Sequence, residues 1–230
     1  ISAKMSRKIG FPISEDLVER ERIIADGTLK NCDFALHYGI SMNIAGGTHH
    51  AFSDHGEAFC MLNDQAIGAK YLLNKGLAKK ILIVDLDVHQ GNGTAEIFQN
   101  DTNVFTFSMH GKSNYPFKKE KSDLDIELEK GTTDDLYLSI LKQNLPKLLD
   151  IVQPDFIFYL SGVDVLKSDK LGTLGLTVHG CKLRDQYVLD TCKKHKIPVQ
   201  CSMGGGYSED IRIIVEAHAN TFRLAQSLYF

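Results

Sequence analysis

The segment that most constrains the fold is residues 81–94, which read ILIVDLDVHQGNGT. A continuous run of β-forming apolar residues ends there in two aspartates, a histidine and two glycines. Such a run is typical of a strand that is buried on both faces of a parallel sheet. The polar residues at its carboxyl end therefore lie where open α/β sheets bind their ligands.

The spacing of these polar residues suits a metal site. Residues i and i+2 on extended backbone point the same way, so Asp85, Asp87 and His89 share one side of the segment. A carboxylate and an imidazole placed two residues apart can bind one metal ion. The alternative is a strand that simply ends in polar loop residues, and this segment alone leaves both interpretations open.

Composition narrows the class of protein. The chain has 230 residues and is 43% hydrophobic, which is enough for a packed core. Its net charge of −3 argues against binding driven mainly by nucleic-acid phosphates. No apolar stretch approaches the roughly 20 residues of a membrane helix, and the start lacks a signal-peptide pattern. We therefore expect a cytoplasmic protein, or a nuclear one in a eukaryote, that binds neither nucleic acid directly nor a membrane.

The cysteines favour a reducing compartment. There are five, an odd number, and none forms a C-x-x-C pair, which suits reduced core thiols better than disulfides or a cysteine zinc site. They are Cys32, Cys60, Cys181, Cys192 and Cys201.

Strands and helices are predicted to alternate along the chain. The patterns indicate a strand that begins at residue 81 and further strands at residues 41–45, 103–107, 155–160 and 198–202. They indicate helices at residues 12–25, 27–38, 63–73, 93–99, 132–152, 180–194 and 210–228. No composition break interrupts this order, so residues 1–230 are predicted to form one α/β domain with a mainly parallel sheet.

Three further polar clusters also follow predicted strands. His49 and His50 come after a glycine pair, Asp164 follows S-G-V, and Tyr207 follows three glycines. All the clusters should therefore lie at one edge of the sheet, whereas chance placement would scatter them over both edges. The glycine run contains no phosphate-binding motif, so we interpret it as allowing close approach of backbone to a cavity.

The candidate metal ligands are Asp87, His89 and Asp164. Two carboxylates and one imidazole leave a coordination position open for water, as in catalytic sites. The set suits zinc and also admits iron(II) or manganese. We therefore expect hydrolysis by a metal-activated water, in which a histidine takes a proton from the water and returns it to the leaving group. Tyr207 can donate a hydrogen bond to the developing oxyanion.

These motifs together resemble the zinc-dependent histone deacetylase family. The resemblance rests on G-G-T-H-H-A with F-C-M-L-N-D, D-L-D-V-H-Q-G-N-G, S-G-V-D and G-G-G-Y, and runs from about Met42 to the C-terminus. It implies a three-layer α/β/α fold of the arginase/deacetylase type with a mainly parallel sheet. The H-Q-G-N-G form, the Tyr115–Pro116 pair and the compact length resemble class IV members and their bacterial relatives.

The resemblance also implies catalytic roles. Asp87, His89 and Asp164 correspond to the zinc ligands. His50 would be the general base and acid, and Tyr207 would polarise the scissile carbonyl. The remaining catalytic pair is His49 with Asp85, in which the histidine is an electrostatic and orienting partner.

Two further sets of residues follow from the resemblance. Phe59, Tyr115 and Gly205 would line a narrow channel for an acylated lysine. A structural monovalent cation, potassium, would be held by the backbone oxygens of Asp85, Asp87, His89 and Met109 together with Ser108.

Some positions depart from the family pattern. Asn92 stands where class I members have an aspartate behind the second histidine, so His50 should have a lower proton affinity. Gln90 replaces a second histidine, and Ala58 replaces a common glycine beside the channel, which could narrow or reshape the entrance. The family's N-terminal strand and helix are expected to be missing before Ile1.

We therefore expect a metal-dependent hydrolase that removes acyl groups from the ε-amine of lysine. An acetylpolyamine or other small acyl-amine amidohydrolase is the alternative enzyme. An arginase-like binuclear site is disfavoured, because Gly91 stands where a further aspartate would be needed. The non-enzyme alternative is an acyl-lysine-binding or corepressor scaffold module. The oligomeric state is left open.

Overall fold

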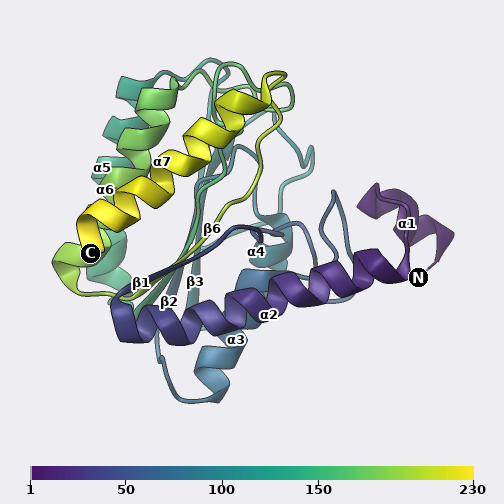
Figure 1. The fold of residues 1–230 in the computed structure, drawn as a ribbon, viewed down its shortest axis with the longest axis horizontal. Helices are drawn as coiled ribbons and strands as arrows, with labels where there is room; N and C mark the ends of the chain where they lie inside the picture. Colours follow the sequence, from purple (N-terminus) through teal and green to yellow (C-terminus); the bar gives the residue numbers. More distant parts are fainter. Residues whose placement is uncertain (1) are drawn as a thin grey trace.

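The computed structural model describes residues 2–230 as a parallel sheet between two layers of helices (Figure 1). In chain order the elements are α1 (Ala3–Ile9), α2 (Glu15–Tyr38), β1 (Ile40–Asn43), α3 (Asp64–Asn74), β2 (Ile81–Asp85), α4 (Asn92–Phe98), β3 (Val104–Gly111), β4 (Leu124–Leu128), α5 (Asp134–Val152), β5 (Phe156–Leu160), α6 (Val178–His195), β6 (Val199–Ser202) and α7 (Ile211–Tyr229). The six strands are parallel, in the order β1-β6-β5-β2-β3-β4. The predicted three-layer fold with a parallel sheet is therefore confirmed.

The apolar run of β2 is buried on both faces of the sheet. Leu82 and Val84 belong to the core that packs against α5, α6 and α7, while Ile81 and Ile83 pack with residues of α2 and α3. Every residue of β2 and of β5 is buried. This two-sided burial explains why both strands read as continuous apolar segments instead of alternating ones.

Helix α2 corrects one prediction, since residues 15–38 form a single helix where the sequence predicts two. Gly27, where the second helix is predicted to begin, lies inside the helix, where a Cβ atom would come within 3.2 Å of Asn43 Nδ2 in β1. The Asn43 amide donates to the Ile24 carbonyl at 3.1 Å and to the Thr28 hydroxyl at 3.0 Å. Close packing of α2 on β1 therefore outweighs the poor helix propensity of glycine.

Two elements have no counterpart among the predicted ones. Strand β4 lies at the edge of the sheet, and its alternating sequence LDIEL is only partly buried. Helix α1 is capped by Ser2, whose side chain accepts a hydrogen bond from the Met5 amide. Neither element has the long apolar pattern on which the other predictions relied.

The strand order places the candidate site at the point where successive strands begin to be added on the opposite side of β2. From β2 the chain proceeds outward through β3 and β4, whereas β5 and β6 lie on the other side of β2. Ligands of open α/β sheets bind at the carboxyl ends of strands beside such a switch point.

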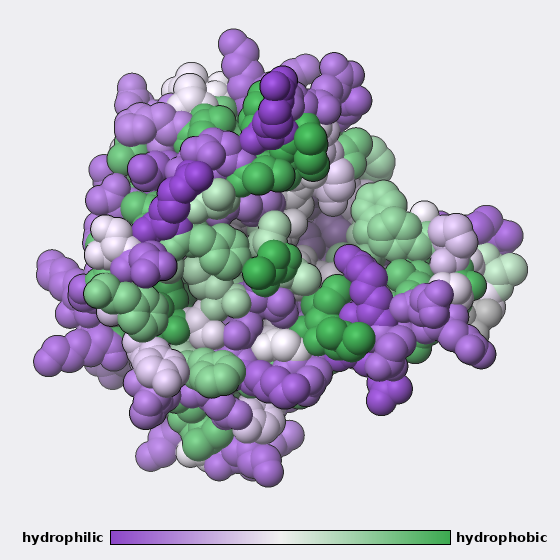
Figure 2. Space-filling model, viewed as in Figure 1, coloured by the Kyte–Doolittle hydropathy of each residue, from purple (hydrophilic) through white to green (hydrophobic). Residues whose placement is uncertain are grey.

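No helix described in residues 2–230 is both long and apolar enough to span a bilayer. Polar side chains cover much of the face shown in Figure 2, with smaller apolar areas between them.

Candidate metal centre and hydrolase site

The tandem histidines lie on the loop that follows β1. Gly46 and Gly47 turn this loop with φ values of 82° and 77°, which glycine adopts readily. The Asp64 carboxylate, at the start of α3, accepts a hydrogen bond from the Gly47 amide at 2.9 Å. His49 and His50 are consequently held in the interior, with ring centroids 4.1 Å apart and both side chains buried.

The three predicted metal ligands converge on one point. Asp87, His89 and Asp164 each offer a ligand atom, and these atoms lie within 4.8 Å of one another. The Nδ1 atom of His89 lies 3.0 Å from an Asp87 oxygen and 3.1 Å from an Asp164 oxygen. All three residues are buried, and their two oxygens and one nitrogen fit a divalent transition metal with an open coordination position.

Backbone amides fix the two ligand carboxylates. The Gly205 amide donates to Asp87 at 2.9 Å, and the Val88 amide donates to Asp164 at 3.0 Å. A Cβ atom at position 205 would come within 2.1 Å of an Asp164 oxygen, so glycine is required there. The resemblance places Gly205 in the substrate channel, whereas the structure places it against the ligand carboxylates.

Electrostatics favours a cation between these carboxylates. Burial, followed by the charge of Asp87, raises the pKa of Asp164 to about 7. Burial alone would lower the pKa of His89, but its contacts with Asp164 and Asp87 raise it to about 10. The carboxylates thus stabilise a positive charge strongly, and metal binding would displace the proton from His89.

The two histidines have opposite charge states. Burial opposes protonation of His49, but Asp85, 2.7 Å from its Nδ1, and then Asp87 raise its pKa to about 9. Burial and the neighbouring His49 lower the pKa of His50 well below its usual 6.5. The Nδ1 atom of His50 lies 2.6 Å from the Asn92 amide oxygen. His50 is therefore a neutral imidazole, and His49 is its charged neighbour.

A cavity of about 420 Å³ leads to these groups. Phe59 and Tyr115, the predicted channel residues, line it together with His50, His89 and Tyr207. Residue Phe59 is 42% exposed and therefore lies at the open part of the cavity.

The backbone beside the cavity is strained. Ala58, which also lines the cavity, has a φ of 43°, and Phe59 has a φ of 67°. Residues with a Cβ atom adopt this left-handed region at a cost, so Ala58 and Phe59 strain the backbone at the entrance.

The Tyr207 backbone is held by a carboxylate on the loop after β5. The Tyr207 amide donates to Asp169 at 2.6 Å, and the other Asp169 oxygen accepts from Leu171 and Gly172 at 2.9 and 2.8 Å. Burial, followed by the charges of the two ligand aspartates, raises the pKa of the Tyr207 hydroxyl. This hydroxyl therefore stays protonated and can donate a hydrogen bond at the cavity.

The predicted cation-binding residues are neighbours in the sheet. Asp85 at the end of β2 pairs with Ser108 of β3, and Met109 follows directly. The Ser108 hydroxyl lies 2.9 Å from the Nδ1 atom of His110.

Four charged residues that the sequence analysis missed support the site. Asp64 holds the histidine loop, and Asp169 holds the tyrosine loop. Arg184 binds backbone carbonyls beside the metal ligands, and Glu57 contacts Asn92. Only Asp64 had a usable signal, because it lies in the F-C-M-L-N-D motif.

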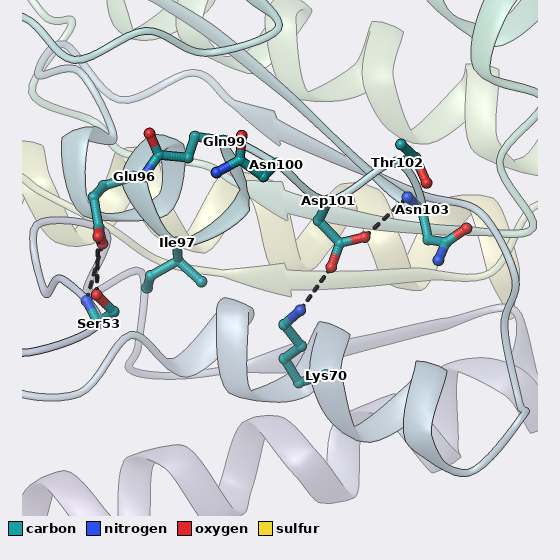
Figure 3. Close-up of a pocket in the computed structure, with 9 residues that line it drawn as sticks. All are labelled: Ser53, Lys70, Glu96, Ile97, Gln99, Asn100, Asp101, Thr102 and Asn103. Atoms are coloured by element: carbon teal, nitrogen blue, oxygen red, sulfur yellow. Dashed lines mark hydrogen bonds and ion pairs between the residues drawn. The ribbon is translucent and has the colours of Figure 1, made fainter.

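A second hollow near α4 has a different character (Figure 3). Glu96 accepts hydrogen bonds there from the Ser53 hydroxyl and amide, at 2.9 and 3.1 Å. Asp101 accepts from Lys70 at 2.6 Å and from the Asn103 amide at 2.9 Å. Glu96 and Asp101 thus bind different neighbours, and they do not converge on one point as Asp87 and Asp164 do on His89.

Comparison with known proteins identifies the family. The histone deacetylase domain matches residues 2–222, so the chain belongs to the histone deacetylase family. It is 47% identical to an uncharacterized protein of a Picosynechococcus species over 229 residues, which cover 100% of this chain and 76% of that protein.

Named relatives are more distant and longer. The chain is 31% identical to histone deacetylase 2 of Arabidopsis thaliana and 33% identical to histone deacetylase HDAC1 of Drosophila melanogaster. These matches cover 93% and 74% of this chain but only 56% and 33% of the two relatives. A crystal structure of the HDA15 HD domain matches with a TM-score of 0.73 and 25% identity, over 88% of this chain and 61% of that one. This match confirms the deacetylase-type fold.

Proposed function

We propose that this protein is a metal-dependent deacylase that hydrolyses the amide bond of an N-ε-acylated lysine. The observation that carries the proposal is the arrangement at the cavity. The neutral imidazole of His50 and the hydroxyl of Tyr207 line the same cavity as His89, and His89 contacts Asp87 and Asp164. Membership of the histone deacetylase family supports this chemistry.

The mechanism assigns a task to each residue. A divalent ion, zinc or iron(II), held by Asp87, His89 and Asp164 would supply an activated water and a positive charge beside the scissile carbonyl. His50 takes a proton at Nε2 and returns it to the leaving lysine amine. The Tyr207 hydroxyl donates to the carbonyl oxygen as negative charge develops on it.

Neighbouring residues complete the site. His49, protonated beside Asp85, adds positive charge next to the base and keeps His50 neutral before the reaction. Phe59 and Tyr115 flank the aliphatic part of the substrate and exclude water from it. We further propose potassium as a structural ion at Asp85 and Ser108, supported by their pairing in adjacent strands. The H-Q-G-N-G sequence with Asn92 supports placement near class IV.

A panel of acyl-lysine peptides tests the function. Acetyl to long-chain acyl peptides and acetylpolyamines should be assayed with zinc or iron(II), in potassium and in choline buffer. We expect lysine peptides to be hydrolysed, more slowly without potassium, and a chelator to abolish turnover. The Asp164→Asn variant should bind metal at least 10-fold more weakly, since it loses a charged ligand. Metal-loaded protein that leaves every acyl-lysine peptide intact would refute the proposal.

A further inference from the structure

A carboxylate lies directly behind the residue that contacts His50. The Asn92 side-chain nitrogen donates to Glu57 Oε1 at 3.3 Å, while its oxygen lies 2.6 Å from His50 Nδ1. The Tyr115 hydroxyl donates to the same Glu57 oxygen. Glu57 thus links His50, through Asn92, to Tyr115 in the wall of the cavity. Glu57 itself is neither the base nor one of the residues that line the cavity.

Glu57 is held in place and stays ionised. Lys8 of α1 donates to its second oxygen at 3.3 Å, and His55 Nε2 lies 3.5 Å from the same oxygen. Burial opposes ionisation, but hydrogen bonds from Tyr115 and Lys8 overcome it and lower the pKa of Glu57. The Glu57 side chain is 17% exposed, so solvent screens it only in part.

The charge of Glu57 fixes the orientation of the Asn92 amide. An ionised carboxylate only accepts hydrogen bonds, so the amide must turn its NH₂ group towards Glu57. A reversed amide would place two oxygens against each other. The Asn92 oxygen therefore faces His50, and the hydrogen of the neutral imidazole must be on Nδ1. The lone pair of Nε2 is left free to accept a proton.

We infer that Glu57 is a positioning residue: acting through Asn92, it fixes His50 in the Nδ1–H tautomer. This inference rests on the proposed function for its catalytic meaning, because only that tautomer can act as the base. The wrong histidine tautomer inactivates a hydrolase even when its geometry is intact. Glu57 also stabilises the positive charge that His50 acquires when it takes the proton.

The test is the isosteric variant Glu57→Gln. A glutamine can donate as well as accept, so both orientations of Asn92 and both tautomers of His50 become accessible. We expect kcat on an acyl-lysine peptide to fall roughly 10-fold, because the productive tautomer is diluted and a neighbouring negative charge is lost. KM should change less than twofold, since no contact with substrate is removed. The matched control is Glu96→Gln, whose carboxylate accepts hydrogen bonds from Ser53 near α4, and which should keep wild-type kcat.

The His50 tautomer is measured directly by long-range ¹H–¹⁵N NMR of histidine-labelled protein, metal-free and zinc-loaded. The His50 signals are assigned with the variant His50→Gln. We expect protonated Nδ1 in the wild type and a mixture in Glu57→Gln.

A double variant, Glu57→Gln/Asn92→Asp, exchanges the amide and the charged group. The amide introduced at position 57 then donates to the carboxylate introduced at position 92, and that carboxylate accepts from His50. The exchange should restore the Nδ1–H tautomer and bring kcat to within about threefold of wild type.

The outcomes separate the inference from the proposed function. An unchanged tautomer together with unchanged kcat in Glu57→Gln would overturn the inference. So would a double variant that folds, as judged by circular dichroism, but retains the mixed tautomer. If the wild type hydrolyses no acyl-lysine peptide, the proposed function fails, and the NMR comparison still decides whether Glu57 sets the tautomer.

Discussion

Arg184 on α6 is positioned to hold the two metal-binding loops together. Its guanidinium is fully buried and donates to the carbonyls of Leu86 at 3.1 Å and Gly162 at 2.7 Å. Leu86 directly precedes the ligand Asp87, and Gly162 lies two residues before Asp164. The same group also donates to the Ser161 carbonyl and forms an ion pair with Asp185 at 2.7 Å. One planar cation therefore fixes the spacing of the loops after β2 and β5.

The variant Arg184→Lys tests this geometry while keeping the charge. An ammonium group can stay beside Asp185 but cannot reach three carbonyls and a carboxylate at once. Loss of two buried hydrogen bonds, at about 1 kcal/mol each, should reduce the free energy of unfolding by about 2 kcal/mol. Looser loops should also weaken zinc binding 10- to 100-fold, as when groups that orient metal ligands are removed.

Two measurements and one control decide the outcome. Urea unfolding of the metal-free protein gives the stability, and competition with a chromophoric chelator gives the zinc affinity. Arg223→Lys is the control, because Arg223 is 58% exposed in its pair with Glu216. This control should change stability by less than about 0.5 kcal/mol and leave zinc affinity unchanged. Wild-type zinc affinity in Arg184→Lys would refute the proposed role in spacing the loops.

Two further predictions follow from the site and its surroundings. Tyr207→Phe removes an oxyanion donor and should lower kcat about 100-fold with an unchanged circular dichroism spectrum; unaltered turnover would exclude Tyr207 from the mechanism. Burial lowers the pKa of His218 to about 4, below its unfolded value of about 6.5, so the folded state binds fewer protons than the unfolded chain between these pH values. The free energy of unfolding should thus fall as the pH drops from 6.5 to 4. Urea unfolding at these two pH values should show a fall that is about 3 kcal/mol smaller in His218→Gln than in the wild type. An identical pH dependence in the variant would contradict this assignment.

The fold could be predicted where burial leaves a strong pattern. Strands β2 and β5 are enclosed on both faces, so their sequences are continuously apolar and identify them directly. Strand β4 is an edge strand whose polar residues face solvent, and its short alternation is too weak a signal. The division of α2 at Gly27 failed for another reason, because the contact with Asn43 that favours glycine there is made in three dimensions.

The site could be predicted where its residues follow the ends of strands. The tandem histidines, the two ligand segments and Tyr207 all come after strands that are adjacent in the sheet, so position in sequence implied position in space. Arg184 offers no such signal, because it lies on a helix 98 residues from Leu86, whose carbonyl it binds. Asp169 likewise gives no signal in the sequence, since its role depends on a contact with Tyr207, 38 residues further along the chain.

The position of Glu57 changes how the asparagine at position 92 is interpreted. From the sequence, asparagine in place of the class I aspartate only removes a negative charge from His50 and lowers its proton affinity. The structure shows that the charge is still present, one residue further away, on Glu57. A carboxylate at that distance can orient the amide, and through it the imidazole, while contributing less to the proton affinity of His50 than an aspartate in direct contact would. Orientation of the base and its basicity are therefore set by different residues, so a substitution at either position should affect the two properties unequally.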